Sequence, residues 1–154
     1  MKRIGMTVVA AFVALTLAGC GGTDDYPETE VASVRLVASW RITDHLQTYE
    51  VRSDAAWQDV WATHEPQSIP PTPRPNFDFS RQMILGVTNG SGPNGCHGLN
   101  IQRIIERRDD LLVEYQVRND SSPLILCTQS IVSLSDFVVV PRSNKMITFR
   151  RADT

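Results

Sequence analysis

Apolar residues alternate with polar ones, or form short continuous runs, in a series of segments spread along most of the chain. Period-two alternation is the pattern of half-buried strands, and short apolar runs are typical of buried ones. The segments are residues 34–40, 47–52, 83–88, 99–105, 111–117, 124–127, 137–140 and 145–150. Residues 99–105 and 111–117 flank the polar sequence Arg107-Arg108-Asp109-Asp110, which predicts a hairpin. The pattern therefore predicts six to eight strands.

One segment has the periodicity of a helix. Trp57, Val60, Trp61 and His64 are spaced at i, i+3, i+4 and i+7, which places them on one face of a helix over residues 55–64. Ser53 or Asp54 is a suitable N-cap residue. Because two tryptophans on a short helix bury a large apolar area, we expect this helix to lie across a sheet.

The remaining segments read as connections. Five of the nine prolines fall in residues 66–75, which predicts an extended connector. Residues 89–98 hold four of the nine glycines and predict a long turn, and residues 119–123 predict another. The expected fold is a single α+β domain, a mainly antiparallel β-sheet with one helix packed on it.

The amino-terminal residues have the three parts of a secretory signal in order. Lys2 and Arg3 are cationic, residues 4–17 are apolar, and Leu-Ala-Gly-Cys ends at Cys20. An apolar stretch of 14 residues is too short to cross a bilayer as a stable helix, and it suits transient insertion and cleavage. We expect residues 1–19 to be a lipoprotein signal peptide and the Cys20 thiol to carry the lipid. The alternative is an ordinary signal peptide in which Cys20 is incidental.

Removal of this signal peptide changes the length and the charge of the chain. It leaves 135 of the 154 residues, which is enough for one domain. Without Lys2 and Arg3 there are 13 basic and 17 acidic side chains, a net charge of −4, which argues against a nucleic-acid partner. Residues 20–30 are polar and contain Gly and Pro, so we expect a lipidated tether there and a single domain over residues 31–154.

The cysteine count is consistent with export. If Cys20 carries lipid, Cys96 and Cys127 are left as a pair in an oxidising compartment, and we expect a disulfide between them. Two free thiols, or one reactive thiol, are the alternatives. Gly21 after the lipidated cysteine is not the aspartate that retains lipoproteins in an inner membrane. We therefore expect a lipid anchor in the cell envelope, on the periplasmic face of the outer membrane if the organism has two membranes.

Several short motifs occur in an order that matches a known family. They are the pair Trp57 and Trp61, the Pro-rich connector, Pro75-Asn76-Phe77-Asp78-Phe79-Ser80, Pro93-Asn94-Gly95-Cys96-His97 and Cys127-Thr128-Gln129. Over residues 47–150 this order resembles the C-terminal domain of the PrcB family, named for a lipoprotein subunit of a spirochaete protease complex. His97 stands where the family usually has an aromatic residue such as Tyr, and residues 130–133 lack its Pro-aromatic pair. The resemblance implies a non-catalytic envelope lipoprotein that assembles with or stabilises a partner, and it carries over no catalytic residues.

The residues themselves contain few candidates for chemistry. Cys96-His97 is the best nucleophile candidate, but adjacent side chains usually point apart, so we favour a structural disulfide. The histidines His45, His64 and His97 sit on three different elements, and we expect neither a metal site nor a cofactor. Asp78 lies between Phe77 and Phe79, where its partner could be the Ser80 N–H of a turn or a ligand.

Two functions are compatible with these observations. The first is a lipid-anchored, non-catalytic interaction domain that binds an envelope protein through a sheet edge or the Gly-rich loop, with Asn94, His97 and Asp78 as candidate surface residues. The second is a small-ligand binder or a hydrolase, with a pocket between the Trp57/Trp61 helix and the sheet.

Overall fold

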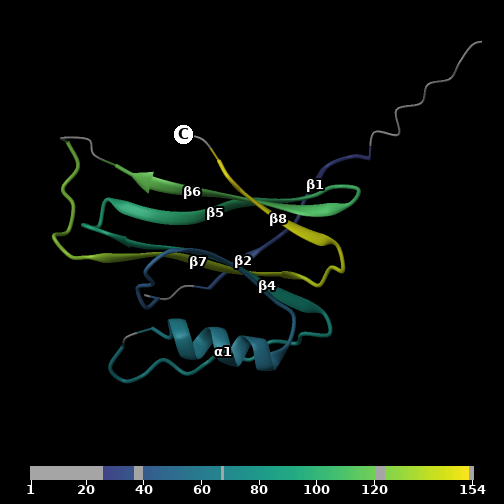
Figure 1. The fold of residues 1–154 in the computed structure, drawn as a ribbon, viewed down its shortest axis with the longest axis horizontal. Coiled ribbons are helices and arrows are strands. Elements are labelled where there is room, and N and C mark those ends of the chain that lie inside the picture. The colour runs from purple at the N-terminus through teal and green to yellow at the C-terminus, as the bar shows by residue number, and fades with distance from the viewer. Residues whose placement is uncertain (1–25, 37–39, 67, 121–123, 153–154) are drawn as a thin grey trace, which may run out of the picture.

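The computed structural model describes residues 26–36, 40–66, 68–120 and 124–152. Two four-stranded sheets stack face to face, and one helix covers the outer face of the second sheet (Figure 1). The elements are β1 (Thr29–Glu30), β2 (Val34–Arg35), β3 (Leu46–Val51), α1 (Asp54–His64), β4 (Gln82–Gly92), β5 (His97–Glu106), β6 (Asp110–Asn119), β7 (Val132–Pro141) and β8 (Met146–Arg151).

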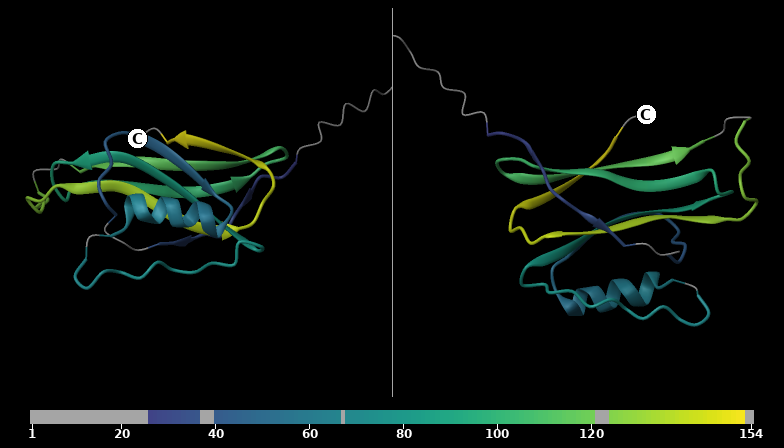
Figure 2. Two further views of the ribbon diagram at one scale, coloured as in Figure 1. Left: turned by 60° about the horizontal axis from the view of Figure 1, so that its bottom comes forward. Right: turned by 180° about the vertical axis from the view of Figure 1, so that it is seen from behind.

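The strands are antiparallel with one exception. The first sheet has the order β1-β5-β6-β8 and the second has the order β2-β7-β4-β3. Only the β6–β8 pair among these strands is parallel. The predicted α+β class, a mainly antiparallel sheet structure with one helix packed on it, is confirmed (Figure 2).

The central strands of the second sheet separate two hydrophobic cores. In β4, Met83, Leu85 and Val87 face the other sheet, whereas Ile84 faces α1. Because both faces of β4 are covered, its residues form a continuous apolar run instead of an alternating one. Gly86 is required in this run, since a Cβ there would lie 2.3 Å from the ring of Phe137.

The helix forms as its sequence predicts. Ser53 is the N-cap, with extended backbone angles, and its Oγ accepts a hydrogen bond from the Ala56 N–H at 3.2 Å. Trp57, Trp61 and His64 are buried on the face that meets the second sheet. Trp40, which precedes β3, packs edge-on against both helix tryptophans.

Two of the predicted boundaries are wrong. The strand expected over residues 34–40 is reduced to Val34–Arg35 in the described part, and residues 37–39 lie outside it. The long turn expected over residues 89–98 is short, because β4 continues to Gly92 and β5 begins at His97. The β4–β7 register shifts in this stretch, and Gly90 has a φ of +74°, so the glycines allow an irregular strand.

The predicted hairpin is present, but its alternation is interrupted. The β5–β6 register shifts between Ile101 and Arg103, so the side chain of Ile104 enters the core between the sheets and that of Arg103 does not. The hairpin turn is closed by a bidentate contact of Arg107 with Asp110, at 2.8 and 2.6 Å.

The strand predicted for residues 124–127 is absent. These residues have no regular secondary structure, and Leu124 and Leu126 are 92% and 101% exposed. Their apolar character is therefore not explained by burial in a sheet. The turn expected at 119–123 lies partly outside the described residues, since β6 ends at Asn119 and residues 121–123 are not described.

The amino-terminal predictions fall mostly outside the described residues. The signal peptide and Cys20 lie there. The last two residues of the expected tether, Thr29 and Glu30, pair with Glu106 and Ile105 of β5. In the part of the chain that is described, no helix has the length and apolar character needed to cross a membrane.

Candidate functional site

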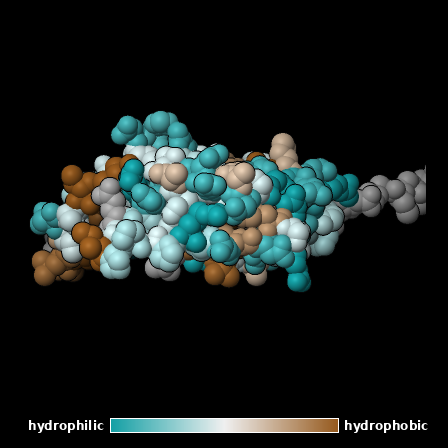
Figure 3. Space-filling view, turned by 90° about the horizontal axis from the view of Figure 1, so that it is seen from below, coloured by the Kyte–Doolittle hydropathy of each residue, from teal (hydrophilic) through white to brown (hydrophobic). Residues whose placement is uncertain are grey.

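Exposed apolar side chains gather at one end of the sandwich. Ten large hydrophobic residues are exposed among the described residues. Six of them lie where β4 and β6 end and where β3 and β7 begin, and the seventh lies in the connection after α1, whose last residue, His64, bonds to Arg41 before β3. Figure 3 shows hydrophobic groups gathered at that end of the molecule. The seven are Ile42, Leu46, Ile69, Leu124, Ile125, Leu126 and Ile131. We call this surface the loop end.

The loop end lies opposite the point where the chain enters the fold. Thr29 pairs with Glu106 at one end of β5, whereas Cys96, bonded to Cys127, immediately precedes its other end. A ten-residue strand is about 30 Å long. The described amino terminus and the loop end are therefore separated by roughly the length of the domain (Figures 1 and 2).

The segment that carries the exposed leucines is fastened to the β4–β5 turn. The predicted Cys96–Cys127 disulfide is confirmed, with Cα atoms 5.2 Å apart. Beside it, the Gly95 N–H donates to the Thr128 carbonyl at 2.9 Å. A Cβ on Gly95 would lie 2.1 Å from Thr128 Oγ1, so only glycine allows this close contact. Leu124 to Ile131 are thus held in place although they pack in no core.

Two of the three predicted surface residues lie at this end. The Asn94 Oδ1 accepts a hydrogen bond from the Cys96 N–H at 3.0 Å and lies 3.0 Å from His97 Nδ1, so the Nδ1 carries the proton that Asn94 accepts. Asn94 and His97 therefore shape the turn to which Cys127 is bonded.

The third predicted surface residue lies elsewhere. Asp78 precedes the other end of β4 and is not brought near Asn94 or His97. Its Oδ1 accepts from the Ser80 N–H at 3.0 Å and from the Ser80 Oγ–H at 2.5 Å. These hydrogen bonds, with the charge of Arg81, hold the pKa of the Asp78 carboxyl below its usual value.

The two arginines near the loop end are paired with carboxylates. Arg41 lies 3.4 Å from Glu65, and Arg118 lies 3.1 Å from Asp120. These pairs are exposed, so each contributes little to stability. The positive charges of Arg41 and Arg118 are therefore neutralised beside the apolar residues of the loop end.

The nucleophile candidate, Cys96, is engaged in a structural bond. The Cys96 sulfur is bonded to Cys127, so it is not a thiolate nucleophile in this structure. No group of three or more His, Cys, Asp or Glu side chains in the described ranges is placed to hold a metal ion.

The space between α1 and the second sheet is filled by side chains. The rings of Trp40, Trp57, Trp61 and Phe137 contact one another, with centroids 4.6 to 6.4 Å apart. This is the packing of a core at the place where a ligand pocket was expected.

A buried histidine closes this core at the helix end. His64 is fully buried, and its Nε2 lies 2.7 Å from the Tyr49 hydroxyl, which in turn donates to the Gln47 side chain. Burial, together with the charge of Arg41, lowers the pKa of His64, so the ring is neutral. Its Nε2–H therefore donates to the Tyr49 oxygen.

Sequence reasoning missed the residues that dominate the loop end. The sequence predicts a strand over residues 124–127, because short apolar runs usually form strands. The signal for an exposed segment is the position of these residues between a polar turn and a bonded cysteine. The chain matches no protein-family model, no curated protein and no solved structure.

Proposed function

We propose that this chain is a lipid-anchored envelope protein whose domain is a non-catalytic interaction module. Its anchor is the lipid on Cys20, and its loop end binds a partner protein of the envelope. The observation that carries the proposal is the grouping of seven of the ten exposed large hydrophobics at that end. Exposed apolar side chains that gather at one end of a domain are characteristic of interaction sites.

The apolar residues of the loop end favour binding for a thermodynamic reason. Each exposed Leu or Ile that becomes fully buried at an interface contributes about 1.5–3 kcal/mol. The disulfide and the Gly95–Thr128 contact hold the segment in place before binding, so little conformational entropy is lost when a partner docks.

The charges around the loop end favour a protein, and not a lipid surface, as its binding partner. A segment that binds anionic lipid carries an excess of Lys and Arg around its apolar residues. Here Arg41 and Arg118 are each paired with a carboxylate. The loop end also lies about 30 Å from the described residues nearest the proposed anchor.

The resemblance to the PrcB C-terminal domain extends this proposal to the kind of partner. It adds that the partner is part of an envelope complex, with a protease as one candidate, which this domain stabilises or assembles. The proposed location is the periplasmic face of the outer membrane in an organism with two membranes, because Gly21 is not a retention residue.

Two pairs of substitutions test the proposal. Leu124→Asp with Leu126→Asp places charges on the loop end, and Tyr26→Asp with Met146→Asp does the same at exposed positions outside it. All four side chains are exposed, so both variants should fold with unchanged unfolding midpoints.

The readout is site-specific photocrosslinking from Ile131 in intact cells, followed by mass spectrometry. We expect one envelope protein to crosslink in the wild type and in the Tyr26/Met146 variant, and this crosslink to be lost in the Leu124/Leu126 variant. The steady-state level of that envelope protein should also fall in the Leu124/Leu126 variant. An unchanged crosslink in the Leu124/Leu126 variant, or crosslinks to lipid alone, would refute the proposal.

A further inference from the structure

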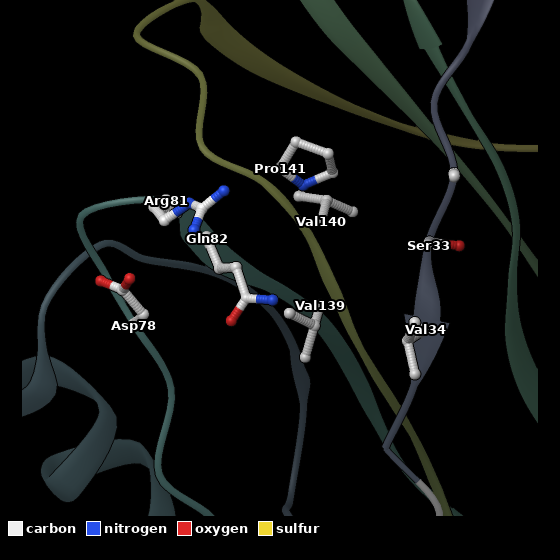
Figure 4. Close-up of a pocket in the computed structure, with 9 residues that line it drawn as sticks. Ser33, Val34, Asp78, Arg81, Gln82, Val139, Val140 and Pro141 are labelled. Atoms are coloured by element: carbon white, nitrogen blue, oxygen red, sulfur yellow. The ribbon is translucent and has the colours of Figure 1, made fainter.

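A second surface feature lies on the second sheet, away from the loop end. It is an open pocket of about 470 Å³ between β2, the end of β7 and the residues just before β4 (Figure 4). Val34, Val139 and Pro141 line its apolar side, and Asp78, Arg81 and Gln82 line its polar side. This volume is within the usual range for sites that bind small ligands or short peptide segments.

The polar side of the pocket carries an arginine without a bonding partner. The Arg81 side chain makes no hydrogen bond or ion pair with any residue of the described ranges. Most other arginines there contact a carboxylate or a carbonyl group, as Arg35 does with Asp136, Arg74 with Asp54 and Arg142 with the Phe79 carbonyl. Arg81 therefore has all its donors available for an anion.

The neighbours of Arg81 restrict which anion fits. Asp78 is ionised, because hydrogen bonds from Ser80 and the charge of Arg81 lower the pKa of its carboxyl. Only the Oδ1 of Asp78 is used by Ser80, so its Oδ2 can accept a further hydrogen bond. A plain anion would be repelled by Asp78, whereas a ligand that carries an anion beside an N–H donor satisfies both side chains.

We propose that this pocket binds the free carboxyl-terminal residue of a peptide. Arg81 pairs with the terminal carboxylate, and the Gln82 amide donates a further hydrogen bond to it. Asp78 accepts from the N–H of the last peptide unit. An apolar last side chain lies over Val34 and Val139, whose methyl groups line the middle of the pocket in Figure 4. Carboxylate recognition of this kind relies on charge-assisted hydrogen bonds.

This site is independent of the proposed function of the loop end. The two surfaces lie at different ends of β4, since Asp78 and Arg81 precede its first residue and Asn94 follows its last. A variant of one surface therefore leaves the other intact, and the two proposals can fail separately.

Calorimetric titration of the purified full chain in detergent tests the proposal. The probes are N-acetyl-Ala-Leu with a free carboxylate, the same dipeptide with an amidated terminus, and inorganic phosphate. We expect the free carboxylate to bind at least tenfold more tightly than the amide or phosphate. Arg81→Gln should weaken this binding about tenfold.

Arg151→Gln is the matched control, because the Arg151 side chain is also exposed and makes no hydrogen bond or ion pair within the described ranges. It should bind the free dipeptide like the wild type. The proposal is overturned if the free dipeptide does not bind at millimolar concentration, if the amide or phosphate binds equally well, or if the two arginine variants behave alike.

Discussion

Reduction of the Cys96–Cys127 disulfide is expected to destabilise the domain substantially. The two cysteines are 31 residues apart, and the closed segment contains all of β5 and β6. The chain-entropy relation for a loop of this length gives about 12 cal/mol/K, or ~3.7 kcal/mol at 25 °C. This is a large part of the 5–15 kcal/mol that typically separates folded and unfolded states.

Urea unfolding of the oxidised and the reduced chain measures this effect without changing a side chain. With a denaturant slope of about 1.5–2 kcal/mol/M, the midpoint should fall by about 2 M on reduction. The Cys96→Ala, Cys127→Ala double variant serves as the control, because its midpoint should be low and should not respond to the reductant.

The outcome that would refute this reasoning is a midpoint that changes by less than about 0.5 M on reduction. It would mean that the crosslink does not restrict the unfolded chain, or that contacts such as the Gly95–Thr128 hydrogen bond hold the same segments together in its absence.

Three further predictions concern the anchor and the two cores. Cys20→Ser should abolish labelling of the chain with radioactive palmitate and release it from the membrane fraction, and retained labelling would exclude the lipidation site proposed here. Gly86→Ala should cost about 1–3 kcal/mol in urea unfolding because its Cβ would meet the Phe137 ring at 2.3 Å, whereas Gly98→Ala, whose nearest contact is 3.4 Å, should be close to neutral. Burial raises the pKa of Asp136 above its ordinary value of 3.8, so its contribution to stability is present at low pH and is lost as pH rises through the raised value. Unfolding free energies of the wild type and Asp136→Asn should therefore diverge above about pH 4, with the variant gaining relative stability, and a constant difference would contradict this sign.

Several elements could be predicted because local interactions determine them. The helix at Asp54–His64 follows from the Ser53 N-cap and the spacing of Trp57, Trp61 and His64, all within one short segment. The hairpin of β5 and β6 follows from two alternating segments and a polar turn. Pairing of Cys96 with Cys127 could be predicted because few cysteines are available.

Other features depended on contacts between segments that are distant in the sequence. The shift after Ile101 in β5 is one example, because the buried Asp136 of β7 accepts the Ile101 N–H at 2.8 Å, a contact that no local pattern reveals. The lengths of β4 and β7 are another, since each strand extends along its partner beyond its own apolar run.

The two candidate sites also combine features set by the local sequence with features set by contacts between distant segments. The sequence by itself determined that Leu124-Ile125-Leu126 is apolar and that a bonded cysteine follows it, and it determined the residue types around Asp78. Only the tertiary structure decided that these leucines are exposed at the end remote from the described amino terminus, and that Arg81 lies across a pocket from Val34. The reason is physical: burial and proximity depend on which distant strands pack together, whereas propensity and periodicity depend only on sequence neighbours.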